Sequence, residues 1–402
     1  MQLFDAPHRP FFLGGLAQVA FALVLWSLWL VGAFADAYAL PALPVSAIAL
    51  HGFFMLYGTF PFFMFGFLST TYPRWMQAKA LTRADYRNPA VLRIAGLALV
   101  YLSLIIGLQA MIAGIIIMAL GDARLAATLL QVYQKAPIPA RRGVAVFNVT
   151  IIAEVIGLLL YAFGLYSAST PVIALAVRVG LFLFLLPTLF GVSYRMIPFF
   201  TASVLPHYRR PASSPQLPLW FLAGTGMHVL LATLGAPGVL VFVDSLLAVV
   251  SWYHLKLWFR RDVVHHGLLL LLYTGFAWSG LGYVLYGIRD LSLALGDAAL
   301  GYAPLHALGL GFALSLVIAM VTRVTRGHSG RALLSDGLSW FALAGVQIAA
   351  ILRIAATFPA IDHLASINLS VFAAPVAIVA LSPWIVRYSY ILLTPRLDKR
   401  PG

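Results

Sequence analysis

The sequence predicts an all-α fold: a polytopic membrane bundle of twelve transmembrane helices forming a single domain over residues 1–402. Three observations support this prediction. The chain is 62% hydrophobic and only 9% charged, whereas soluble domains carry about 25% charged residues. Its apolar runs are close to the roughly 20 residues that a bilayer-spanning helix needs. Its basic residues fall in loops at alternate ends of these runs, as expected for a multi-pass protein.

The first apolar run, from Phe11 to Phe34, has the length of a membrane span. No charged segment followed by a short apolar stretch and a cleavage site precedes it, so we expect no cleaved signal. The run over 90–133 is predicted to form two helices, because a single one would be about 66 Å long, twice what a bilayer needs. Gly107 and Gln109 mark the turn. The predicted spans are 11–34, 46–71, 90–106, 108–133, 144–166, 171–200, 216–234, 237–258, 266–287, 300–322, 336–358 and 367–393.

Loop charges set the expected orientation. Loops after odd-numbered spans hold one basic residue, Arg289, together with Asp36, Asp290, Asp297 and Asp362. The positive-inside rule therefore places both termini and the loops after even-numbered spans in the cytoplasm. The basic residues of those loops and of the tail are Arg74, Lys79, Arg83, Arg87, Lys135, Arg141, Arg142, Arg209, Arg210, Arg260, Arg261, Arg326, Arg331, Arg396, Lys399 and Arg400.

The net charge of +14 would suggest nucleic acid as a partner if the protein were soluble. Membrane orientation explains this charge better, so we expect a lipid bilayer and no nucleic acid. The chain has no cysteine, which excludes disulfides, thiolate metal ligands, iron–sulfur clusters and cysteine nucleophiles. Any bound metal must use histidine, methionine, tyrosine or carboxylate.

Two histidines are the main candidates for chemistry. His51 and His306 each lie five or six residues from the predicted outer end of a span, or roughly 8–9 Å along the helix axis. Gly58, Gly309 and Ala313 follow them on the same helix faces. Two imidazoles with room for a flat plate between them fit axial ligation of a haem iron. Alternatively, each imidazole hydrogen-bonds a neighbouring hydroxyl or carbonyl.

Other ionisable residues lie inside predicted spans, where unpaired charges are costly. We expect Glu154 or Asp244 to pair with Arg178 or Arg353, and in particular Glu154 to be paired with an arginine; a proton path through Glu154 is the alternative. His228 and His254 are weak candidates for copper ligands, because imidazole suits copper but each is alone on its helix.

A four-helix repeat is suggested by the ends of spans two, six and ten. Arg74, Arg195 and Arg323 occupy similar places there, 121 and 128 residues apart, although any spanning helix can end on an arginine. Three four-helix repeats with histidines on spans two and ten resemble the catalytic subunit I of haem–copper oxidases and nitric oxide reductases. Span six has no histidine, where those enzymes place a copper ligand.

Motifs spread over the whole chain carry a resemblance to one family. In chain order they are Arg9-Pro-Phe-Phe-Leu13, His51-Gly-Phe-Phe-Met-Leu-Tyr-Gly58, Gly66-Phe-Leu-Ser-Thr-Thr-Tyr-Pro-Arg-Trp75, Tyr194-Arg-Met-Ile-Pro-Phe-Phe-Thr201, His306-Ala-Leu-Gly-Leu-Gly311 and Met320-Val-Thr-Arg-Val-Thr-Arg-Gly-His-Ser-Gly-Arg331. The chain resembles the NnrS family of bacterial inner-membrane proteins, which is linked to nitric oxide metabolism and is haem- and copper-containing.

The resemblance implies haem b, copper as a further metal, and a role in nitric oxide stress or denitrification. Where the family's ninth span carries a histidine, this chain has Tyr273, a rarer and harder iron ligand. Secondary motif residues are Arg9, Tyr72, Arg74, Arg195, Tyr273, Arg323, His328 and Arg331. We read the basic residues among them first as partners of helix dipoles and lipid headgroups.

The favoured function is therefore a haem-bearing membrane protein of the nitric oxide response that binds or turns over nitric oxide. Whether it is an enzyme stays open. The rival function is a secondary transporter of a small solute or metal-related cargo without haem, which twelve spans and internal repeats also fit.

Overall fold

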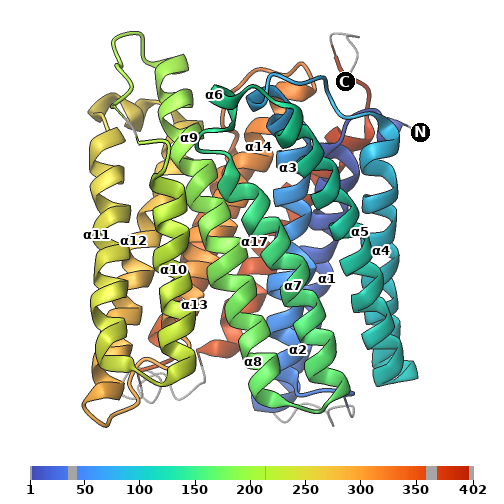
Figure 1. The fold of residues 1–402 in the computed structure, drawn as a ribbon, viewed down its shortest axis with the longest axis vertical. Coiled ribbons are helices and arrows are strands. Elements are labelled where there is room, and N and C mark those ends of the chain that lie inside the picture. Colours follow the sequence, from blue (N-terminus) through green and yellow to red (C-terminus); the bar gives the residue numbers. More distant parts are fainter. Residues whose placement is uncertain (1, 35–42, 213, 359–368, 398–402) are drawn as a thin grey trace.

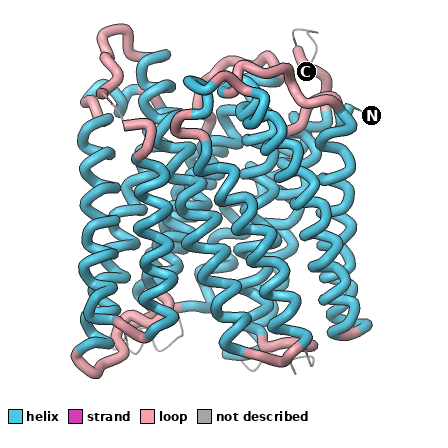
Figure 2. The backbone as a smooth tube through the Cα atoms, viewed as in Figure 1, coloured by secondary structure: helices cyan, strands magenta, loops and turns pink. Residues whose placement is uncertain are grey.

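The structure is a computed structural model and describes residues 2–34, 43–212, 214–358 and 369–397. Over these residues the chain forms long helices joined by short loops and contains no strand (Figure 2). Twelve helices in the described ranges are long and apolar enough to cross a membrane, which confirms the predicted fold class. The start of α1 and the end of α17 lie at the same end of the bundle, at the top of Figure 1. We call this the terminal end and the opposite one the distal end.

The helices follow one another up and down through the bundle. In chain order the elements are η1 (Gln2–Phe4), α1 (His8–Phe34), α2 (Ala47–Phe53), η2 (Phe54–Thr59), α3 (Phe60–Trp75), α4 (Arg83–Ile106), α5 (Leu108–Lys135), α6 (Ile138–Arg141), α7 (Ala145–Tyr166), α8 (Thr170–Arg178), η3 (Val179–Leu185), α9 (Leu186–Val204), α10 (Leu217–Leu234), α11 (Pro237–Trp258), η4 (Arg261–His265), α12 (Gly267–Ala294), α13 (Ala303–His306), η5 (Ala307–Leu314), α14 (Ser315–His328), α15 (Gly337–Ala355) and α17 (Ser370–Leu393).

Several helices extend beyond their predicted ends, α4 and α12 furthest. Helix α4 begins at Arg83, because Thr82 forms a capping box in which its backbone N–H donates to Asp85 at 2.7 Å. Helix α12 runs to Ala294, so Arg289 lies within a helix and not in a loop as predicted. The predicted start of the last span, residue 367, lies outside the described ranges.

Spans two, six and ten are each interrupted by a π-helical segment: η2, η3 and η5. The first residues of these segments, Phe54, Val179 and Ala307, are 125 and 128 residues apart, close to the spacing that suggested a four-helix repeat. In two of them a hydroxyl bonds the carbonyl five residues earlier: Thr59 to Phe54 at 2.8 Å and Ser315 to Leu310 at 3.3 Å. Such segments replace α-helical bonds and often occur at functional sites.

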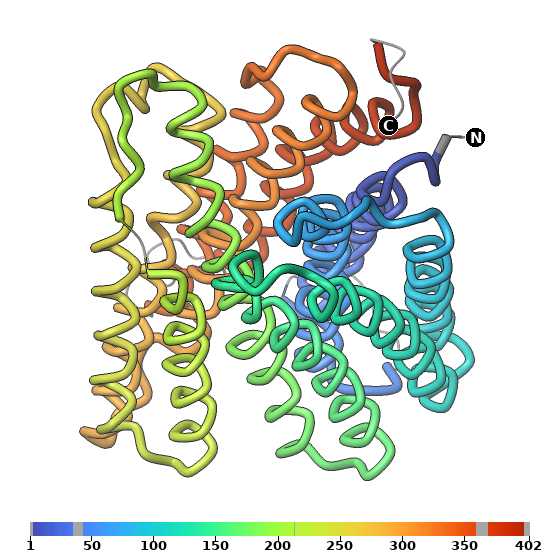
Figure 3. Tube along the Cα trace, turned by 45° about the horizontal axis from the view of Figure 1, so that its top comes forward, coloured from blue at the N-terminus to red at the C-terminus, as the bar shows by residue number. Residues whose placement is uncertain are grey.

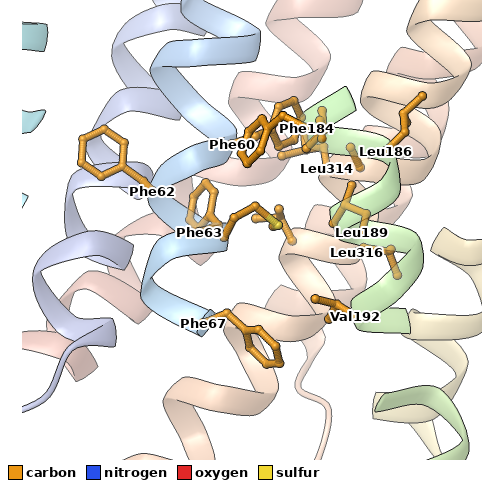
Figure 4. Packing of buried hydrophobic residues seen from close by; sticks show 14 of the residues in the cluster. Phe60, Phe62, Phe63, Phe67, Phe184, Leu186, Leu189, Val192, Leu314 and Leu316 are labelled. Atoms are coloured by element: carbon orange, nitrogen blue, oxygen red, sulfur yellow. The ribbon is translucent and has the colours of Figure 1, made fainter. Parts of the chain in front are cut away.

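These three interrupted spans meet in the core of the bundle. Figure 4 shows phenylalanines of α3, among them Phe60 and Phe63, beside Leu189 of α9 and Leu314 of η5. Nearly all of these side chains are fully buried. Because lipid tails are as apolar as the side chains, close packing holds such helices together. The core therefore holds the three interrupted spans against one another.

Tyr57 of η2 shows how tightly these spans approach. Its hydroxyl donates to the carbonyl of Ala176 in α8 at 2.6 Å. A Cβ atom on Gly157 of α7 would lie 2.0 Å from this hydroxyl, and one on Gly180 would lie 2.6 Å from it. Only glycine leaves room for the tyrosine ring at these two positions.

The first and last spans pack on each other, so the bundle closes on itself (Figure 3). Arg9 of α1 donates from Nη1 to the carbonyls of Leu392 and Thr394 at the end of α17, at 3.2 and 3.1 Å. These carbonyls lack partners within the helix, and a cation there complements the helix dipole. Arg9 thus joins the two ends of the chain, as its structural interpretation predicted.

Asp336 caps α15 at the terminal end. Its carboxylate accepts from the Ser339 backbone N–H at 2.8 Å and hydroxyl at 2.6 Å, and from Tyr388 at 3.1 Å. Arg326 pairs with it at 3.2 Å. Burial alone would raise the pKa of Asp336, but these hydrogen bonds and the arginine together hold its pKa below the usual value.

Candidate functional site

An apolar cavity of about 120 Å³ at the distal end brings His51 and His306 together. Six spans line it, including α1, the three interrupted spans, α15 and α17. Its polar side chains are the two imidazoles, Thr59, Ser370 and Arg353, and the rest are mostly leucine, alanine and other apolar residues. A small set of polar groups in an apolar cavity is typical of a cofactor or ligand site.

The His306 ring is held in one orientation. Its Nδ1 lies 2.9 Å from the carbonyl of Tyr302, which can only accept, so Nδ1 carries the proton. Its Nε2 then has a free lone pair, which accepts from Nε of Arg353 at 3.3 Å. A histidine that donates through one ring nitrogen to a backbone carbonyl and presents the other is arranged as metal-ligating histidines are.

His51 is held differently. Its ring stacks on Trp26 of α1, with centroids 3.9 Å apart. Its Nδ1 is buried and has no hydrogen-bond partner among the residues described. A buried polar atom without a partner costs about 1–3 kcal/mol, so this nitrogen is the clearest sign of a missing ligand in the cavity.

The small residues expected beside the two histidines have different surroundings. Gly309 lines the cavity, and a Cβ there would meet no atom within 4 Å. Gly58 instead packs against Gln18, whose Nε2 would lie 2.7 Å from a Cβ on Gly58. The expected open space is therefore present beside His306. Beside His51, the small residue that lines the cavity is Gly52 and not Gly58.

The donor atoms and the apolar lining of this cavity are of the kinds that can hold a haem. His306 presents Nε2, the His51 Nδ1 lacks a partner, and Arg353 supplies a cation for a carboxylate group. The volume of about 120 Å³ is smaller than the roughly 300–1,000 Å³ usual for ligand pockets. A second apolar cavity, of about 350 Å³, adjoins it across Trp26, His51 and Met55.

A second cluster joins His228 of α10, Asp244 of α11 and Asp290 of α12. Their ligand atoms lie within 4.8 Å of one another, and all three side chains are buried. His228 Nδ1 is 2.7 Å from Asp244 Oδ1, and Asp290 pairs with Arg289 at 2.8 Å. The second oxygen of each carboxylate has no hydrogen-bond partner in the described part of the chain. One imidazole and two carboxylates can hold a divalent cation.

Glu154 lies in a third buried cluster, with Arg93 of α4 and Asp122 of α5. Arg93 Nη1 pairs with Asp122 and lies 3.3 Å from Glu154. Its Nη2 donates to the carbonyl of Tyr57, which lies four residues before Pro61, a residue with no N–H. The prediction that Glu154 pairs with an arginine is confirmed.

The partners expected for the intramembrane acids were wrong, however. Glu154 pairs with Arg93 and not with Arg178 or Arg353, and Asp244 pairs with His228. Arg93 and Asp122 were missed, although each is a charge within a predicted apolar span, which is itself a signal of a buried pair.

Several secondary motif residues have structural partners. The Tyr72 hydroxyl donates to Asn148 at 2.9 Å. The Tyr273 hydroxyl bonds the carbonyl of Trp258 at 2.9 Å and Thr201 at 3.0 Å. Neither tyrosine lines the cavity of His51 and His306, so the structure offers no role for Tyr273 as a ligand there. His254 also lies apart from that cavity and bonds the carbonyl of Val250 at 2.8 Å.

The remaining motif residues gather at the terminal end. Arg74, Arg195, Arg323 and His328 line one cleft there. His328 also packs against His8, with ring centroids 4.7 Å apart. Arg331 lies just beyond α14, where burial, together with Arg387 and Arg326, lowers the pKa of its guanidinium. Motifs from three spans thus converge on one surface, far from the two distal histidines.

Comparison with known proteins gives one result that covers the chain. No curated protein matches it. The family model described as NnrS protein matches residues 2–396, which is essentially the whole chain. With its membrane-spanning bundle, the protein belongs to the NnrS family.

Proposed function

We propose that this NnrS-family protein holds a haem b between His51 and His306 and acts in the nitric oxide response of a bacterial inner membrane, in nitrosative stress or denitrification. The observation that carries the proposal is the pair of imidazoles on one apolar cavity, one with a fixed ring and a presented Nε2, the other with an unpartnered buried nitrogen. Such a donor set suits axial ligation.

Each residue has a distinct part in this proposal. His306 is the anchored ligand, because the Tyr302 carbonyl fixes its tautomer. Arg353, which donates to its Nε2 at 3.3 Å, would supply the cation for a carboxylate group of a bound haem. Trp26 stacks on His51 and lines both adjoining cavities. Its position therefore determines how much space a haem ring would have beside His51. Haem held by two imidazoles supplies one-electron chemistry.

With haem held by both imidazoles, binding of nitric oxide would require one of them to be released. The His51 ring is held by stacking, with no hydrogen bond to Nδ1 among the residues described. The His306 ring has a hydrogen bond to the backbone at 2.9 Å. His51 is therefore the histidine that would be released more readily.

Copper is proposed at the cluster of His228, Asp244 and Asp290. Its donors are nitrogen and oxygen, which suit Cu(II) rather than Cu(I), since the chain has no thiolate. Metal analysis of the purified protein tests this: His228→Ala should lower the copper content, and equal copper in both proteins would exclude the site.

The second candidate function is a secondary transporter without haem. The three interrupted spans favour it, because transporters often build substrate sites on broken helices. In this case the distal cavity would hold the cargo.

A visible spectrum of the purified protein separates the two functions. We expect a Soret band and, after reduction, the sharp α and β bands of a low-spin haem. His51→Ala and His306→Ala should each lose haem or turn it high-spin, whereas His207→Ala, in an exposed loop, should match the unmodified protein. If the protein shows no Soret band after incubation with haem and removal of the unbound haem, the haem site is refuted and transport is favoured.

A further inference from the structure

The terminal end carries a cleft of about 930 Å³ that is far more basic than the rest of the bundle. Five arginines from five different parts of the chain line it: Arg74, Arg195, Arg210, Arg323 and Arg396. Among the described residues that line the cleft there is no aspartate or glutamate. Arg195 and Arg323, which pair with no carboxylate in the described ranges, therefore repel each other across this cleft, and a bound anion would offset that repulsion.

The lack of a carboxylate partner is clearest for Arg323. It is only 8% exposed, and it lies near the end of α14 with its guanidinium 3.8 Å from the centre of the Phe200 ring. No carboxylate in the described ranges pairs with it. A cation–π contact contributes about 0.5–2 kcal/mol, which is less than the cost of burying an unpaired charge. A guanidinium that merely met lipid headgroups at the membrane surface would be exposed.

Arg195 of α9, on another of the three interrupted spans, also lies against an aromatic ring. Its guanidinium lies 4.7 Å from the centre of the Trp75 ring, and its side chain is only partly exposed. The aromatic rings beneath Arg195 and Arg323 belong to other helices, so the fold fixes both guanidinium groups. Two such fixed groups on one cleft can each offer a pair of parallel N–H donors to the same anion.

We propose that this cleft binds a phosphate group, carried by an anionic phospholipid headgroup or by a soluble phosphate compound. Phosphate suits the site because its charge approaches −2 near neutral pH and its oxygens match the planar fork of arginine. Residues near the ends of α3, α9 and α14 line the cleft, whereas the two histidines belong to α2 and α13, toward the other end of the bundle (Figure 1), so this proposal does not depend on haem.

Pyrophosphate and a defined lipid serve as probes for the two sources. Delipidated protein in neutral detergent is titrated with pyrophosphate at constant ionic strength, and nanodiscs of phosphatidylglycerol or phosphatidylcholine are analysed by native mass spectrometry. We expect saturable binding of pyrophosphate, retention of phosphatidylglycerol over phosphatidylcholine, or both. Binding of pyrophosphate alone identifies a soluble phosphate compound, and retention of the lipid alone identifies a headgroup.

Two variants and one control locate the site. Arg323→Gln should weaken binding about 10- to 100-fold, the usual loss for a hydrogen bond to a charged group. Arg195→Gln should weaken it similarly and is available if Arg323→Gln folds poorly. Arg261→Gln removes an exposed arginine at the same end that does not line the cleft. The proposal is overturned if neither probe binds, or if Arg261→Gln weakens binding as much as the other two.

Discussion

The cluster of Arg93, Asp122 and Glu154 makes a prediction about non-additive stability. It holds one guanidinium and two carboxyl groups, with side chains 0%, 1% and 0% exposed. Two carboxylates and one arginine would leave a net negative charge in the apolar interior, so one carboxyl group must hold a proton. Arg93 is closer to Asp122, which makes Glu154 the protonated partner in the native protein.

Replacing either acid alone should therefore cost little. In Glu154→Gln the amide keeps the hydrogen-bonding groups of a protonated carboxyl group. In Asp122→Asn, Glu154, which already lies 3.3 Å from Arg93, releases its proton and becomes the charged partner of the arginine. We expect each single variant to lie within about 1 kcal/mol of the unmodified protein. The double variant leaves Arg93 without a carboxylate, and an uncompensated buried charge costs about 3–5 kcal/mol.

Unfolding in mixed micelles with increasing dodecyl sulfate measures these free energies. The double variant should lose at least about 1 kcal/mol more than the two single variants together, which is above the usual error of additivity. Arg93→Met, which removes the cation, should also be strongly destabilised. Additive losses, or a single variant as unstable as the double one, would show that both carboxyl groups are charged or that neither pairs with Arg93.

Four further predictions concern other parts of the molecule. A reporter active only in the periplasm should give no signal at the C-terminus; a strong signal would end the proposed orientation. Gly309→Leu should fold normally but hold less haem per protein than Gly309→Ala, because it fills open cavity space; equal haem would contradict this. Gly157→Ala, whose Cβ would lie 2.0 Å from the Tyr57 hydroxyl, should lower stability by about 1–3 kcal/mol, with partial recovery in Tyr57→Phe. Asp336→Asn should cost about 1 kcal/mol at pH 7. Since the folded pKa of Asp336 is lowered, that difference should shrink as pH falls below about 4, and a constant difference would refute it.

The number of spans and their order could be predicted from the sequence because hydrophobic length is a strong signal in a lipid environment. The residue at which α12 ends could not be predicted from the sequence. Arg289 and Asp290 look like loop residues, and only the fold places Asp290 beside His228 and Asp244, where it is buried within a helix. Charged residues near span ends are therefore poor guides to helix boundaries.

The candidate site was predictable in part. The positions of His51 and His306 at similar depth were visible in the sequence, and both line one cavity. The stacking of Trp26 on His51 and the hydrogen bond from Arg353 to His306 were not, because they depend on how α1 and α15 turn against other helices. No periodicity in a single chain encodes such rotations between spans.

The π-helical segments have a consequence for how this chain tolerates changes in length. An α-helix turns about 100° and rises about 1.5 Å per residue, and a π segment accommodates one residue more than the α-helical turn it replaces. His51 and His306 both lie distal to such a segment. Deleting one residue from η2 or η5 would restore a regular α-helical turn and leave the histidine facing the cavity, because the extra residue is taken up within the π turn itself. A single-residue deletion in the regular α-helix of such a span would instead rotate the side chains beyond it by about 100°, so deletion scanning would distinguish the three π segments from the rest of each span.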